Sequence, residues 1–213
     1  MRDLWAPHPT DRLAPVILTH MASPPDQPPL AQVPSSPSAA EARPLSLIAI
    51  AGTAVFVGAI IGASTNTING AVSPAYFINI LGWSEVSDVW RASVAQGVFE
   101  GLIFGMISAM IFTLTIGIVT RATCPYTVAF RYLLAIMLGA YGCWVLGGLI
   151  AIGLALLSPE FYHHAFIGVP WETAEMLRYA WVGGSIWGVE FGGILSLIIG
   201  LVTFRGRWKR RAG

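Results

Sequence analysis

Four long apolar segments constrain this chain more than any other feature. They cover about residues 45–67, 92–119, 132–157 and 178–204. Each is long enough for a helix that crosses the hydrocarbon core of a bilayer, which takes roughly 20 residues. A backbone in lipid must satisfy its own polar groups, and segments of this length do so as helices and not as barrel strands. The sequence therefore predicts an all-α membrane protein with four transmembrane helices.

The composition agrees with a bilayer as the surroundings of the chain. Only 11% of the 213 residues are charged and 55% are hydrophobic, whereas a soluble domain carries about a quarter charged residues. The net charge is +1, and no basic patch alternates with aromatic residues, so no nucleic-acid partner is expected. The two cysteines, Cys124 in a short loop and Cys143 deep in an apolar segment, are not expected to form a disulfide.

The two ends of the chain differ from its middle. Residues 1–43 are rich in Pro, Ser and Ala and hold only short apolar runs, which predicts a disordered tail. The run "LAPVIL" is too short for the apolar region of a signal peptide, so no cleaved signal is expected. Met21 is an alternative start, because residues 1–20 show no pattern. Residues 206–213 form a basic tail.

The distribution of positive charge predicts the orientation. Most Lys and Arg residues fall in the two tails and in the loop after the second segment, whereas the other two loops hold only Arg91 and Arg178. By the positive-inside rule both termini are cytoplasmic, in a multi-pass protein of the cell (inner) membrane. The residues on the cytoplasmic side are Arg2, Arg12, Arg43, Arg121, Arg131, Arg205, Arg207, Lys209, Arg210 and Arg211.

The second half of the chain resembles the first. The string "SPAYF" at 73–77 matches "SPEFY" at 158–162 with an offset of 85 residues, and an offset of 87 superimposes the acidic, basic and glycine positions that follow. We interpret this as a tandem duplication of a two-helix hairpin, with hairpins at 44–121 and 122–205. Two helices return the chain to its starting side, so the predicted pseudo-two-fold axis runs along the membrane normal.

The loops on the outer side carry helix-start signals. Ser73 and Ser158 each precede a proline, which predicts serine caps on two short helices. Arg91 and Arg178 follow Asp88 and Glu175 by three residues, a spacing that permits an ion pair.

Small residues recur every four positions in all four segments. Such stripes let helix backbones approach closely in lipid. The stripes predict tight helix packing, either within the chain or against a second chain, so that a homo-oligomer and a membrane-protein partner both stay open. The glycines concerned are Gly58, Gly62, Gly97, Gly101, Gly105, Gly139, Gly147, Gly184, Gly188 and Gly192.

Two glutamates lie inside apolar segments. Insertion of an acidic residue near a helix centre costs about 2.5–3.5 kcal/mol. Gln96 lies one turn before Glu100, and the 87-residue offset puts Glu190 on the equivalent face of the fourth helix, one turn deeper. We therefore expect Glu100 and Glu190 to approach the interface between the two hairpins. They serve either an ion, proton or polar-solute path or a structural role as hydrogen-bonding carboxyls.

Other chemistry has little support in the sequence. Glu160 and His164 have the i, i+4 spacing of helical metal ligands and are weak candidates. Phosphate-binding glycine loops and the GxSxG, HExxH and CxxC motifs are absent, so no cofactor is expected. A membrane-bound enzyme that uses residues of the outer loops has no motif in its favour and is the third alternative for function. The first prediction for function is a glycine-packed membrane subunit or scaffold. The alternative is a small channel or transporter that works through Glu100, Glu190 and Gln96.

Overall fold

The computed structural model describes residues 42–212, and all of its regular elements are helices. The predicted tail at 1–43 and the alternative start at Met21 lie outside the described residues, except that positions 42 and 43 begin the first helix. The elements are α1 (Ala42–Val72), α2 (Pro74–Leu81), α3 (Val89–Thr120), α4 (Tyr126–Leu157), α5 (Pro159–Ala165) and α6 (Thr173–Ala212).

Four of these helices are long and apolar enough to cross a membrane, as the hydropathy of the sequence predicted. Their apolar spans are Leu45–Val72, Val89–Thr120, Tyr126–Leu157 and Thr173–Arg210, with mean hydropathies between 1.8 and 2.4. Each of these helices is longer than the apolar segment from which it was predicted. The basic residues after position 205 were expected as a tail and instead continue α6.

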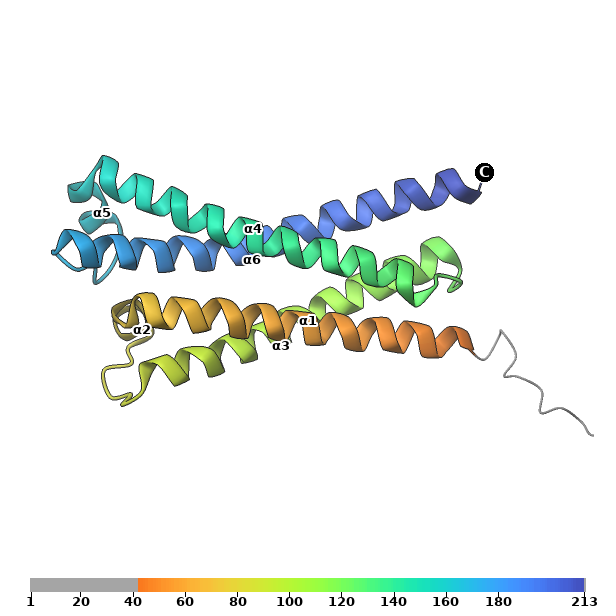
Figure 1. Cartoon of the computed structure of the whole chain (residues 1–213), viewed down its shortest axis with the longest axis horizontal. Helices are drawn as coiled ribbons and strands as arrows, with labels where there is room; N and C mark the ends of the chain where they lie inside the picture. The colour runs from red at the N-terminus through yellow and green to blue at the C-terminus, as the bar shows by residue number, and fades with distance from the viewer. Residues whose placement is uncertain (1–41, 213) are drawn as a thin grey trace, which may run out of the picture. The chain divides into compact units, whose positions relative to one another are not determined.

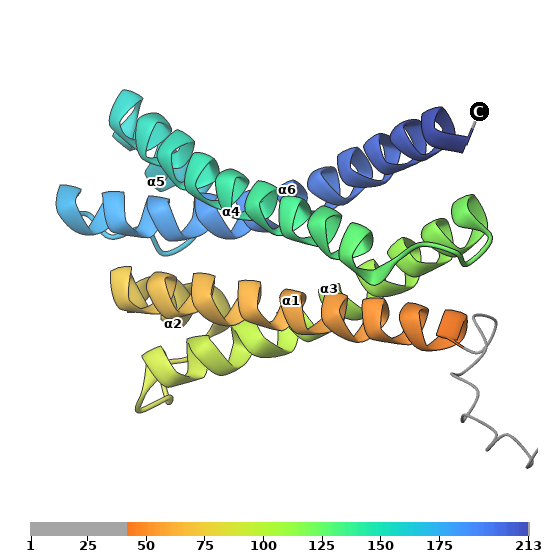
Figure 2. The ribbon, with the colours of Figure 1, turned by 45° about the vertical axis from the view of Figure 1, so that its right-hand side comes forward.

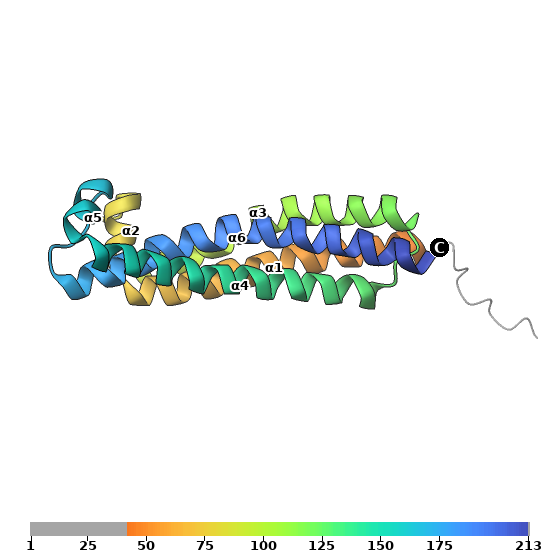
Figure 3. The same cartoon turned by 90° about the horizontal axis from the view of Figure 1, so that it is seen from above.

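The long helices form two pairs. α1 packs along α3, and α4 packs along α6, far more extensively than either pair packs against the other (Figure 1). The two helices of each pair cross (Figure 2). The short helices α2 and α5 both lie at one end, and the last turns of α6 lie at the opposite end (Figure 3). We call the α2 and α5 end the cap end and the opposite end the basic end.

Glycines make the close contact within each pair. A β-carbon added at Gly62 would overlap the backbone of Gly97 and Gly101, and one added at Gly58 would lie 2.6 Å from the Cα of Gly105. Because no side chain stands between them, the two backbones touch along this stripe.

The α4–α6 pair has the corresponding contacts. A β-carbon at Gly147 would overlap the backbone of Gly184 and lie 2.8 Å from the Cα of Gly188. Cys143 fills the space beside Gly192, and Gly139 faces the side chain of Ser196. The glycines singled out in the sequence therefore all contact the partner helix of their own pair.

The cap end differs in one detail from the sequence prediction. Ser73 and Ser158 are the N-cap residues of α2 and α5, and a proline follows each of them. Neither serine side chain makes a capping hydrogen bond. The backbone carbonyl of Ser73 accepts from the N–H of Tyr76 instead, at 3.2 Å. The Oγ of Ser73 is buried without a partner among the described residues.

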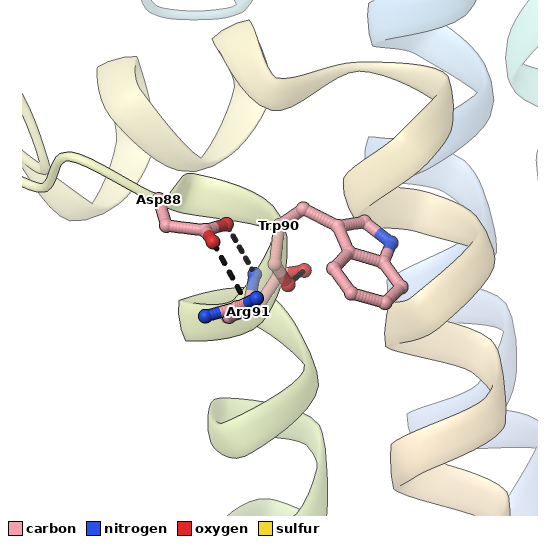
Figure 4. A network of polar contacts seen from close by, with 4 residues as sticks. Asp88, Trp90 and Arg91 are labelled. Carbon is pink, nitrogen blue, oxygen red and sulfur yellow. Dashed lines mark hydrogen bonds and ion pairs between the residues drawn. The ribbon is translucent and has the colours of Figure 1, made fainter.

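The start of α3 shows the predicted ion pair (Figure 4). Asp88 Oδ1 accepts from the backbone N–H of Arg91 at 3.0 Å, and the Nε of Arg91 lies 3.2 Å from Asp88 Oδ2. The side chain of Trp90 points toward α1, where its indole N–H donates to the carbonyl of Thr67 at 3.0 Å. The second predicted pair, Arg178 with Glu175, has an N–O distance of 2.7 Å.

A few polar contacts join the two helix pairs. α1 meets α4 through the hydroxyls of Thr53 and Tyr126, 3.0 Å apart, and through those of Ser64 and Tyr141, 2.5 Å apart. Ser185 of α6 donates a hydrogen bond from its Oγ to Asn69 Oδ1 of α1 at 3.0 Å. Toward the basic end, an apolar core closes the bundle. It includes Ile50, Phe112, Ile116, Leu133 and Phe204.

Candidate intramembrane site between the helix pairs

A cavity of about 370 Å³ lies between the two helix pairs. All four long helices contribute to its wall, and most of the wall is apolar. Glycines form part of the α1, α3 and α6 walls, so their missing side chains leave room there. The lining residues are Gly58, Ile61, Gly62, Thr65 and Asn66 of α1; Glu100, Gly101, Ile103, Phe104 and Ile107 of α3; Ala140 of α4; and Ile186, Val189, Glu190, Gly193 and Ile194 of α6.

Glu100 and Glu190 are the only charged residues in this wall. They come from different helix pairs, α3 and α6, and both residues are exposed. Glu100 lies about three helical turns from the start of α3. This part of the cavity wall therefore lies well inside the apolar span of α3. The structure therefore brings these two carboxyls to the same cavity.

Gln96 stands beside the cavity and not in its wall. Its side-chain amide donates a hydrogen bond to Glu100 Oε1 at 2.7 Å. The i, i+4 spacing on α3 makes this contact local. Gln96 therefore fixes the orientation of the Glu100 carboxyl.

Asn66 belongs to the site and was missed by the sequence analysis. Its side chain lines the cavity and is only 6% exposed. Among the described residues it makes no side-chain hydrogen bond; only its backbone carbonyl accepts one, from Ser93. Its spacing of four from Gly58 and Gly62 places Asn66 on the packing face of α1, but the polar run 66–70 also fits a helix that leaves the membrane.

A contact between the pairs forms part of the cavity wall. A β-carbon at Gly193 of α6 would lie 3.0 Å from the ring of Phe104, which shows that the aromatic ring lies directly on this glycine. A core of buried apolar side chains from all four long helices lies toward the basic end.

Tyr76 of α2 lies at the other side of the cavity. Its ring packs on Gly183 of α6, where a β-carbon would lie 3.1 Å away, and its centroid is 5.1 Å from that of Tyr179. Burial raises the pKa of Tyr76, and the negative charges of Glu190 and then Glu100 raise this pKa further. The tyrosine is therefore near enough to sense both carboxyls electrostatically.

The cap end is held together across the pairs by one further hydrogen bond. The side-chain amide of Asn79, on α2, donates to the carbonyl of Gly168 before α6 at 2.6 Å. Gly168 has a φ of +68°, a conformation that favours glycine. This contact keeps α2, and with it Tyr76, beside the start of α6.

The weak metal candidates lie elsewhere. Glu160 and His164 are exposed on α5, and the neighbouring His163 ring stacks on Trp171 with centroids 4.2 Å apart. Within residues 42–212 no group of three or more His, Cys, Asp or Glu side chains is placed to hold a metal ion. Cys124 and Cys143 are free thiols.

Comparisons with protein-family models, with curated proteins and with solved structures find no match for this chain.

Proposed function

We propose that this chain is a small membrane transporter that binds a proton or a cationic solute at Glu100 and Glu190. One observation carries the proposal: carboxyls from two different helix pairs share one cavity inside the apolar spans. Acidic residues at such a depth are costly and are typical of ion, proton and substrate paths. A carboxylate can bind either a proton or a cation, so the two compete at the same atoms.

The apolar core toward the basic end favours a transporter over an open channel. A channel needs a continuous path, whereas the apolar core closes this bundle toward the basic end. In a transporter the cavity opens to the two sides of the membrane in turn. The loose contact between the helix pairs is a suitable place for such a movement.

The role of a membrane subunit or scaffold has less support. The glycine stripes, for which packing within the chain and packing against a second chain were both open, make their contacts within the chain. A homo-oligomer or a partner membrane protein would therefore have to use other surfaces of the described helices.

We also infer that the two hairpins arose by duplication, and equivalent geometry supports this. Ser73 and Ser158 have nearly identical dihedral angles, with φ of −146° and −149° and ψ of 88° and 86°. Gly82 and Gly168 both have a φ of +68°. An offset of 85 or 87 residues also superimposes the glycine contacts of α1 with α3 onto those of α4 with α6.

The proposed orientation places the basic end in the cytoplasm. At the cap end, Arg91 and Arg178 are each paired with a carboxylate. At the basic end, the segments 121–131 and 205–210 hold six cations and no acidic residue: Arg121, Arg131, Arg205, Arg207, Lys209 and Arg210. This asymmetry follows the positive-inside rule.

Proton flux in liposomes tests the function. Reconstituted protein should dissipate an imposed pH gradient, followed with an entrapped pH-sensitive dye, faster than protein-free liposomes do. Glu100→Gln and Glu190→Gln should each slow this rate by about tenfold or more, because an amide cannot take up and release the proton. Glu172→Gln, at an exposed loop position, is the matched control and should leave the rate unchanged. Equal rates for wild type and both cavity variants would rule out the carboxylate mechanism.

A further inference from the structure

The volume of the cavity is informative about the size of what it holds. About 370 Å³ lies within the range of roughly 300–1,000 Å³ that is typical of small-molecule pockets. A single water takes about 30 Å³ of liquid, so a lone proton or dehydrated ion would leave most of this space unfilled.

The charged residues in the cavity wall indicate the sign of the charge that a ligand carries. Glu100 and Glu190 are acidic, and none of the residues that line the cavity is a Lys, Arg or His. An anion would meet two carboxylates and no counter-charge, which is unfavourable at low dielectric. A cation placed between them is attracted by both.

The uncharged residues of the cavity wall indicate that the remainder of the ligand is apolar. Ile103, Phe104, Ile186 and Val189 present apolar surface from α3 and α6. This surface is stabilised by an apolar group that displaces water from it. An aromatic face beside a cation adds a further attraction.

Asn66 supplies a separate polar contact. Its side chain is more than nine-tenths buried, lines the cavity and has no hydrogen-bond partner among the described residues. The fully buried side-chain atoms without a partner lie on other residues, including Asn69 and Ser73, so the amide of Asn66 keeps access to the space of the cavity. An N–H donor in the cavity would therefore satisfy the amide oxygen of Asn66.

We propose that the cavity binds an organic ammonium ion with an apolar body, its N–H groups directed to Glu100, Glu190 and Asn66 and its body against Ile103, Phe104 and Ile186. The proposal rests on the proposed function and names the class of its cationic solute. A lipid acyl chain fits the apolar surface but would leave both carboxyls and Asn66 unpaired. The bound amine and a proton exclude each other at the carboxyls.

Three ligands of one shape test this on the wild-type chain in nanodiscs of phosphatidylcholine. They are 1-naphthylmethylamine, which is protonated at neutral pH, its neutral analogue 1-naphthylmethanol, and the anion 1-naphthoate. Equilibrium dialysis should give the amine an affinity at least about tenfold higher than either analogue. Equal binding of the three, which would indicate partition into lipid or an apolar site, overturns the proposal.

Variants locate the bound amine. Glu100→Gln and Glu190→Gln should each weaken amine binding by about tenfold, Asn66→Leu by several-fold, and the exposed Glu172→Gln not at all. Circular dichroism and size-exclusion chromatography show whether each variant is folded, and the comparison of the three ligands on wild type does not depend on any variant.

The outcomes separate this proposal from the proposed function. If the pH gradient is dissipated through Glu100 and Glu190 but the amine binds no better than its analogues, the ligand class is wrong and the function stands. If the amine binds through both carboxyls but no flux depends on them, the site is an ammonium site and transport is wrong. A co-purified lipid that the amine fails to displace from the cavity also overturns the ligand class.

Discussion

At the scale of single residues, the site depends on a few polar groups placed where lipid-facing helices usually have none. Glu100 and Glu190 could be found from the sequence, because a carboxylate stands out in an apolar run. Asn66 could not be separated from the polar end of its helix, since the run "NTING" also fits a helix that leaves the membrane. Its role depends on the position of α3 and α6 around it, and periodicity within one helix does not contain that information.

Cys124 provides a prediction at this scale. The residue is 4% exposed at the turn between α3 and α4, and burial raises the pKa of its thiol above the ordinary value. Because the thiolate is the reactive form, a raised pKa slows alkylation at neutral pH. We expect slow reaction with a maleimide at pH 7, a rate that rises with pH, and a large increase on unfolding in detergent with denaturant. Mass spectrometry of the labelled peptide gives the rate; fast labelling of the native protein at pH 7 would contradict the burial.

At the scale of helices, hydropathy predicted the four long elements but not their ends. α4 begins at Tyr126, six residues before the apolar segment, and α6 continues to Ala212. Hydropathy marks the part of a helix that lies in lipid, whereas the backbone hydrogen bonds continue through the polar interface. The glycine spacing indicated which faces pack. It did not indicate the partner, because the same stripe serves a helix of the same chain or of another.

The glycine stripe gives a prediction at the scale of helix pairs. Gly62→Ala should destabilise the protein by about 1–3 kcal/mol, because its methyl group would overlap the backbone of Gly97 and force α1 from α3. Gly52→Ala is the matched control on the same helix. Nothing lies within 4 Å of the β-carbon that it adds, so its stability should stay within about 1 kcal/mol of wild type.

Unfolding by titration with a denaturing detergent, followed by circular dichroism, compares the two variants with wild type. Equal stability of Gly62→Ala and Gly52→Ala would show that α1 and α3 are not in backbone contact at Gly62.

At the scale of the whole described chain, two tightly packed pairs are joined by a weaker interface. Within a pair the backbones touch, whereas between pairs the contacts include three side-chain hydrogen bonds from α1 and the ring of Phe104 on Gly193. The sequence indicated the pairing through its internal similarity. It did not indicate the cavity, which depends on how side chains of all four long helices meet between the pairs.

The orientation in the membrane is a prediction at this scale. Single cysteines at Ser84, in the exposed connection before α3, and at Thr127, exposed at the start of α4, report on the two ends. In a background with Cys124→Ala and Cys143→Ala, a membrane-impermeant maleimide added to intact cells should label Ser84→Cys and leave Thr127→Cys unlabelled. Both should react after the cells are opened. The opposite pattern in intact cells would place the basic end outside.

The cavity at the interface between the pairs has a consequence for the surrounding lipid. If the pairs move apart to release what the cavity holds, the cross-section of the protein in the plane of the bilayer increases. That increase does work against the lateral pressure of the acyl chains. The energy of opening therefore depends on bilayer thickness and chain packing as well as on the side chains in the wall, and the same protein should exchange its ligand at different rates in thin and thick membranes.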